Sequence, residues 1–142
     1  KMKELIAADS NICRNYKLLT SIKGVGPITA IVMLCSTLNF TKITDHRKFA
    51  CYCGLAPFEH SSGTSVRGGC HTSSMANRDI KVQLNRSALI AIRCDPQLKA
   101  YYERKVAEGK HKFSVLNAVR AKIAARCFAV VRRGTPYVAL QI

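Results

Sequence analysis

The sequence has few acidic residues and no long apolar segment. Only eight of its 142 residues are Asp or Glu, and these are scattered along the chain. No apolar run approaches the roughly 18 residues that a membrane-spanning helix requires, and the first ten residues lack the pattern of a secretory signal peptide. These absences argue against a transmembrane helix and predict a cytoplasmic protein.

The cysteines do not form the pattern of a disulfide framework. There are seven of them, an odd number, at irregular spacings. Several lie in apolar runs, as Cys127 does, which is typical of reduced cysteines packed as small hydrophobic side chains. A zinc ion held by Cys51, Cys53, Cys70 and His71 is disfavoured, because a C-x-C spacing is not the usual one. We therefore predict no metal site.

Basic residues greatly outnumber the acidic ones. The chain has 23 Lys and Arg residues and a net charge of +15. Residues 1–66 carry +4, whereas residues 67–142 carry 15 basic and four acidic residues, or +11. Such an excess predicts a polyanionic partner, most commonly nucleic acid. A basic surface that serves only solubility is the alternative.

Apolar spacing and helix-breaking residues predict a mainly α protein with a small helical bundle. We expect residues 1–16 to be the end of a linker helix and residues 17–53 to form a hairpin region. Residues 54–78 are expected to be a long loop, and residues 79–142 a helical region with a basic face. The individual helices are expected at residues 3–16, 17–23, 28–38, 45–53, 79–93, 96–108 and 113–133, with possible short strands near residues 51–56 and 65–72.

Two of these predicted helices have a clear apolar face. In residues 79–93 the basic side chains of Arg86 and Arg93 lie opposite that face. In residues 113–133 a basic stripe runs beside it. The apolar faces consist of Ile80, Leu84, Ala88 and Ala91 in the first helix and of Leu116, Val119, Ile123, Cys127 and Val130 in the second, whose basic stripe is Lys122, Arg126 and Arg133.

Residues 19–30 resemble a helix-hairpin-helix motif, with Gly24-Val25-Gly26 at the turn. Two glycines allow a tight turn and a close approach to another backbone. The second helix would then present unpaired N–H groups and its positive dipole end to a phosphate, with Lys23 adding a charge. The alternative is a helical hairpin used only for packing.

The predicted loop at residues 54–78 is rich in Gly and Ser. A serine becomes a nucleophile only when a base takes its proton or nearby charge stabilises the alkoxide. Candidates for these roles lie close in sequence, although a flexible polar loop would have the same composition. They are Glu59 and His60, the Gly63 that would admit a substrate backbone, and Arg67, Arg78 and Arg86, which could hold a phosphate.

From about residue 17 to residue 137, the chain resembles the C-terminal domain of DEDD-type transposases of insertion-sequence family 110, which are related to the pilin-gene DNA invertases. Several motifs in the same order carry the resemblance. They are the glycine hairpin in residues 18–32, the stretch at residues 49–57, the pair Ser62-Gly63, the stretch at residues 96–103, the pair Gly109-Lys110 and the run at residues 119–122.

The resemblance implies a protein that rearranges DNA with two catalytic parts. An N-terminal RuvC-like domain, absent from this chain, would bind a divalent metal such as Mg through acidic residues. The C-terminal domain would supply a serine that forms a covalent phosphoserine link to DNA. That serine corresponds to Ser62, with Ser61 as the alternative. Some family members use a guide RNA encoded by the element, and joining several DNA ends favours a homo-oligomer.

We therefore expect a fragment of a transposase that binds DNA and is nearly inactive in isolation. A non-catalytic helix-hairpin-helix DNA-binding module is the main alternative, and a basic RNA-binding structural protein is a third. No cofactor is expected within this chain. The expected nucleic-acid contacts are Lys23, Gly24, Gly26, Arg67, Arg78, Arg86, Lys110, Lys122 and Arg126.

Overall fold

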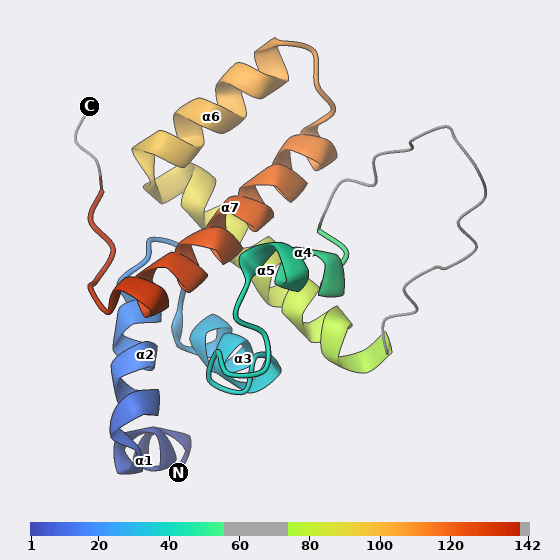
Figure 1. The fold of residues 1–142 in the computed structure, drawn as a ribbon. Helices are drawn as coiled ribbons and strands as arrows, with labels where there is room; N and C mark the ends of the chain where they lie inside the picture. Colours follow the sequence, from blue (N-terminus) through green and yellow to red (C-terminus); the bar gives the residue numbers. More distant parts are fainter. Residues whose placement is uncertain (56–73, 140–142) are drawn as a thin grey trace.

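The computed structural model describes residues 1–55 and 74–139, and every regular element in that part of the chain is an α-helix (Figure 1). The mainly α fold predicted from the sequence is confirmed. None of these helices combines the length and the apolar character needed to cross a membrane. In chain order the helices are α1 (Met2–Ala8), α2 (Ser10–Thr20), α3 (Pro27–Ser36), α4 (His46–Tyr52), α5 (Ser74–Cys94), α6 (Pro96–Ala107) and α7 (Lys112–Arg133).

The long helix α7 organises the packing. It contacts α2, α4, α5 and α6, and Figure 1 shows it running through the middle of the molecule. The apolar faces predicted for α5 and α7 are confirmed, since every residue of both faces is buried. Phe128 of α7 also packs against Phe40 and Phe49, with ring centroids 4.9 and 5.3 Å apart, and so holds α4 and the loop before it in place.

Side-chain caps explain most of the helix boundaries. The carboxylates of Asp45 and Asp95 accept backbone N–H bonds at the starts of α4 and α6, as expected for N-cap residues. Pro96 occupies the first turn of α6, where its missing N–H is not needed. Gly134, with φ of 70°, ends α7 in the left-handed conformation that glycine adopts readily.

Four sequence predictions are wrong at these boundaries. The helix expected over residues 3–16 is broken at Asp9, whose carboxylate accepts the N–H of Asn11 at 2.9 Å and starts α2. That helix then continues without a break to Thr20, where a separate helix was expected. No strand forms over residues 51–55, which finish α4 and turn at Gly54, and α5 begins at Ser74 rather than at residue 79. The strand expected at residues 65–72 lies outside the described residues.

Candidate nucleic-acid interface

Most of the positive charge in the described residues has no acidic partner. Carboxylates form ion pairs with only three Lys or Arg side chains in residues 1–55 and 74–139, namely Arg104, Lys105 and Arg126. The remaining cationic side chains are largely exposed. Because unpaired cations on a surface attract a polyanion, the folded chain keeps the electrostatic character that its composition predicted.

The turn between α2 and α3 uses its two glycines differently. Gly24 has φ of 95°, and a Cβ atom added there would lie 2.7 Å from the carbonyl oxygen of Ser87. The close approach to another backbone that the sequence predicted is therefore found at Gly24, against α5. Gly26 has φ of −90°, and nothing lies within 4 Å of the position that its Cβ would occupy. Gly24 thus serves packing, and Gly26 faces open space.

Gly26 is also the N-cap of α3, and no side chain caps this end of the helix. Pro27 follows in the first turn, and Lys23 is exposed in the preceding turn. The helix is anchored to α5 from inside, where the hydroxyls of Thr29 and Ser87 lie 3.1 Å apart. The uncapped N–H groups of the first turn, the open space at Gly26 and the charge of Lys23 leave room for a phosphate at this point.

Two residues of the predicted basic stripe on α7, Lys122 and Arg126, have different surroundings in the structure. Lys122 is exposed, and its amine lies 4.5 Å from the ring centroid of Tyr101. Arg126 is mostly buried instead, and it donates hydrogen bonds to Asp95 at 2.7 Å and to Gln97 at 2.8 Å. Its guanidinium also lies over the ring of Tyr137. These contacts give Arg126 a structural role that joins α7 to the start of α6.

The pKa of Asp95 reflects its pairing with Arg126. Burial by itself would raise the pKa of this carboxyl group. The hydrogen bond from Arg126 and those from the backbone N–H groups of Leu98 and Gln97 outweigh that effect, and the pKa of Asp95 is lowered from its usual value. Asp95 is therefore an ionised cap that also binds a cation.

Three further predicted contacts lie on the surface. Arg78 and Arg86 are exposed along α5, and Lys110 is exposed in the turn between α6 and α7. Arg67, Ser61 and Ser62 lie outside the described residues. The described chain stops at Leu55 and resumes at Ser74, so the structure shows the two ends of this segment and not the predicted nucleophile.

The chain leading into that segment is held by polar contacts that sequence reasoning missed. The carbonyl oxygen of Leu55 accepts a hydrogen bond from the side chain of Asn117 at 3.0 Å. One turn further along α7, Arg120 donates to the Oδ1 atom of Asn85 at 2.6 Å. The sequence did place Arg120 in a family-like run at residues 119–122, but only the packing of α5 on α7 shows what the residue faces.

The cysteines near this point are poor candidates for metal ligands. Burial raises the pKa of the Cys53 thiol to about 12, against a smaller opposing effect of Lys81, whereas Cys51 is exposed. Cys70 and His71 lie outside the described residues. Among the residues that are described, no three His, Cys, Asp or Glu side chains come close enough together to hold a metal ion.

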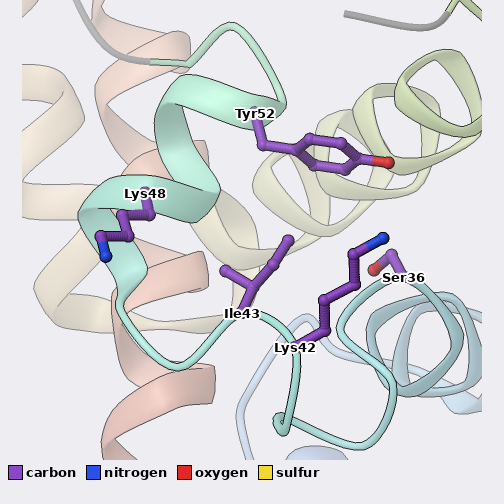
Figure 2. Close-up of a pocket in the computed structure, with 5 residues that line it drawn as sticks. All are labelled: Ser36, Lys42, Ile43, Lys48 and Tyr52. Carbon is purple, nitrogen blue, oxygen red and sulfur yellow. The ribbon is translucent and has the colours of Figure 1, made fainter.

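A small cavity of about 290 Å³ lies between the end of α3 and α4 (Figure 2). Figure 2 shows the Lys42 side chain extending beside Ser36, while the Lys48 amine points in another direction. Because the two amines do not converge, the cavity does not hold one anion between them. Its lining residues are Ser36, Lys42, Ile43, Lys48 and Tyr52.

Comparison with known proteins identifies the family. A family model described as "Transposase IS116/IS110/IS902 family" matches residues 16–103, which is more than half of the chain. The chain belongs to this transposase family. The sequence-based resemblance is therefore confirmed at the level of the family.

Individual relatives agree with that assignment. An insertion element IS110 protein of 43.6 kDa from Streptomyces coelicolor is 39% identical over 121 residues, which are 84% of this chain and 29% of the relative. The pilin gene-inverting protein of Moraxella bovis is 24% identical over 135 residues, or 94% of this chain and 42% of the relative. An insertion element IS900 protein from Mycobacterium paratuberculosis is 30% identical over 112 residues, 78% of this chain and 28% of the relative. The chain thus spans less than half the length of each.

Proposed function

We propose that this chain is the DNA-binding, serine-bearing part of a transposase that catalyses DNA transposition or recombination. Membership of the transposase family over residues 16–103 is the observation that carries the proposal. A relative named as a pilin gene-inverting protein supports it, since inverting a gene requires that DNA be cut and rejoined. The chain covers only part of its relatives, so the activity is assigned to the full-length protein.

DNA is the proposed partner of the exposed basic surface. The supporting features are the net charge of +15, the open N-terminus of α3 beside Lys23, and the exposed Arg78 and Arg86 on α5. Contacts of this kind go to phosphates and carry no sequence information by themselves. The target site is therefore chosen by other means, for which a guide RNA encoded by the element is our proposal.

Ser62 is the proposed nucleophile. Its oxygen would attack the phosphorus of a DNA phosphodiester, and the bond from phosphorus to one deoxyribose oxygen would break. That oxygen takes up a proton and leaves as a hydroxyl, while the phosphate remains on Ser62 as a phosphoserine ester. Because one phosphate ester replaces another, the freed hydroxyl can later attack the phosphoserine and rejoin the strand. Arg67, Arg78 or Arg86 would stabilise charge on the phosphate in transfer.

Proton transfer and metal binding complete the proposal. His60 is the nearest candidate in sequence for taking the proton of Ser62, and a group from another part of the protein is the alternative. The described residues bring no metal-binding set together. The resemblance to DEDD-type transposases leads us to assign the divalent metal to an acidic domain elsewhere in the full-length protein, which we expect to act as a homo-oligomer.

Trapping the covalent adduct tests the role of Ser62. The full-length protein is incubated with DNA that carries its element ends, and the protein–DNA adduct is counted on a denaturing gel. Ser62→Ala should abolish the adduct while leaving DNA binding unchanged, and the matched variant Ser61→Ala should retain adduct. Normal adduct from Ser62→Ala would refute the assignment, and loss only in Ser61→Ala would transfer the role to Ser61.

The same assay distinguishes the proposed catalytic function from the main alternative, a non-catalytic DNA-binding module. A non-catalytic DNA-binding module would bind DNA, and neither serine substitution would alter any product. The uncapped N-terminus of α3 is compatible with both functions. Adduct formation that depends on either serine would rule out the binding module, and its absence from an active full-length preparation would favour it.

A further inference from the structure

Arg120 has no acidic partner among the residues that the structure describes. The side chain is half-buried on α7 and faces α5. One terminal nitrogen donates to Asn85, whose amide is neutral, at 2.6 Å. The Nε atom is buried and has no hydrogen-bond partner. No carboxylate of the described residues lies within ion-pair distance of the guanidinium.

A second cation lies at the same part of the fold. Lys81 is on α5, one turn before Asn85, and its amine lies 3.1 Å from the position that a Cβ atom on Gly54 would occupy. Asn117, one turn before Arg120 on α7, holds the carbonyl oxygen of Leu55. Lys81 and Asn117 thus lie at the end of α4, each one turn along its helix from a member of the Asn85–Arg120 pair, and no described carboxylate forms an ion pair with Lys81 or Arg120.

Such an arrangement is unfavourable for the chain alone. A charge withdrawn from water is destabilising unless it is paired, and a buried N–H without a partner adds to that penalty. Burial accordingly lowers the pKa of Arg120. Arg126 on the same helix provides the contrast, because it is also partly buried and has Asp95 as its partner. An anion supplied from outside would give Arg120 what Asp95 gives Arg126.

We propose that Arg120, with Lys81 one turn before its partner Asn85 on α5, is an anion site for a phosphodiester of the nucleic-acid substrate. The proposal rests on the DNA-binding function above for the identity of the anion. A guanidinium suits this task because its planar N–H groups match a phosphate, and one of them is fixed in advance by Asn85. The site lies where α4 ends, so a phosphate bound here is positioned by the rigid packing of α5 on α7.

The substitution Asn85→Asp provides a sharp test because it places the missing carboxylate 2.6 Å from the guanidinium with almost no change in shape. In the full-length protein we expect the thermal unfolding midpoint without DNA to rise and affinity for duplex DNA to fall at least tenfold. The matched control is Asn11→Asp, which makes the same charge change at an exposed position on α2. The control should change DNA affinity less than threefold.

A second pair of variants tests the charge itself. Arg120→Gln should leave the unfolding midpoint equal or higher, weaken DNA binding, and reduce the slope of log affinity against log salt by about 0.9, the value for one phosphate contact. Arg120→Lys keeps the charge without the planar fork and should recover part of the affinity. Arg132→Gln, an exposed position on the same helix, is the control.

Four results would overturn the inference. Normal DNA affinity of Arg120→Gln would show that no phosphate binds at Arg120. The proposed DNA-binding function would still stand in that case, because the unsubstituted protein would still bind DNA. A lower unfolding midpoint without a change in the affinity of the folded protein would give Arg120 a structural role only. If Glu59→Gln destabilises the protein and adds nothing to Arg120→Gln, the partner is an internal carboxylate. Absence of DNA binding by the unsubstituted protein would overturn both this inference and the proposed function.

Discussion

Replacing Gly24 with alanine should weaken the fold through a single contact. The residue has φ of 95°, where an L side chain is strained, and its missing Cβ leaves space for the docking of the α2–α3 turn on α5. A methyl group there would lie 2.7 Å from the Ser87 carbonyl oxygen and 3.0 Å from the Cβ atom of Ala91. One of these two neighbours is backbone, so the turn must move away from α5.

The size of the effect follows from three contributions. A left-handed conformation costs a non-glycine residue roughly 1–2 kcal/mol, and overpacking typically costs about 1–3 kcal/mol. The smaller entropy of the unfolded alanine chain returns about 0.4–1 kcal/mol. We therefore expect Gly24→Ala to lower the free energy of unfolding by about 1–5 kcal/mol. The middle of this range corresponds, for a domain of this size, to a fall of roughly 10 °C in the melting temperature.

Gly26→Ala is the matched control for this measurement. Its φ of −90° suits any residue, and no atom lies within 4 Å of the added methyl group. Urea and thermal unfolding of both variants, followed by circular dichroism, should show a loss of less than about 1 kcal/mol for Gly26→Ala, the range expected for an N-cap change. Equal stability of the two variants would refute the docking of Gly24 on α5.

Three further outcomes are expected. Gly26→Val should weaken DNA binding, measured by fluorescence anisotropy, because its side chain enters the open space beside α3. It should cost only the stability of an N-cap change, about 1 kcal/mol, as in Gly26→Ala. Unchanged binding would count against a phosphate there. Asp95→Asn should destabilise the protein by about 2–4 kcal/mol at pH 7, because it leaves Arg126 buried without its ion pair. The folded pKa of Asp95 is lowered, so its stabilisation is complete above the unfolded value of 3.8 and is lost as the pH falls through the folded pKa. The difference in urea midpoint between the unsubstituted protein and Asp95→Asn should therefore shrink below about pH 4. A difference that stays constant at lower pH would contradict the pairing. Cys53 and Cys127, both with pKa values raised to about 12 by burial, should react with a thiol reagent only when the protein unfolds. The exposed thiols of Cys35, Cys51 and Cys94 serve as the comparison, and labelling of Cys53 or Cys127 in the native state would contradict the packing.

Local sequence determined where most helices begin and end. The helix-capping roles of Asp45, Asp95 and Gly134 depend on hydrogen bonds or dihedral angles that involve only neighbouring residues. These roles can therefore be predicted from the sequence alone. The buried faces of α5 and α7 follow from helical periodicity for the same reason. Asp9 was missed because an apolar spacing that continues across residues 3–16 concealed a capping residue within it. The transposase family could also be predicted from the sequence, because several of its motifs occur there in the same order.

Tertiary packing decided what the individual charges and glycines do. Both glycines of the turn look alike in sequence, yet only Gly24 meets α5. Arg120 and Arg126 are separated by less than two helical turns, and one faces a neutral amide while the other faces a carboxylate. Pairing of charges depends on which helices lie side by side and at what rotation, and residues more than thirty positions apart set that arrangement. The sequence alone therefore determined the helical character and the positive charge of this chain, whereas only the packed structure showed which of the described positive charges lack an acidic partner.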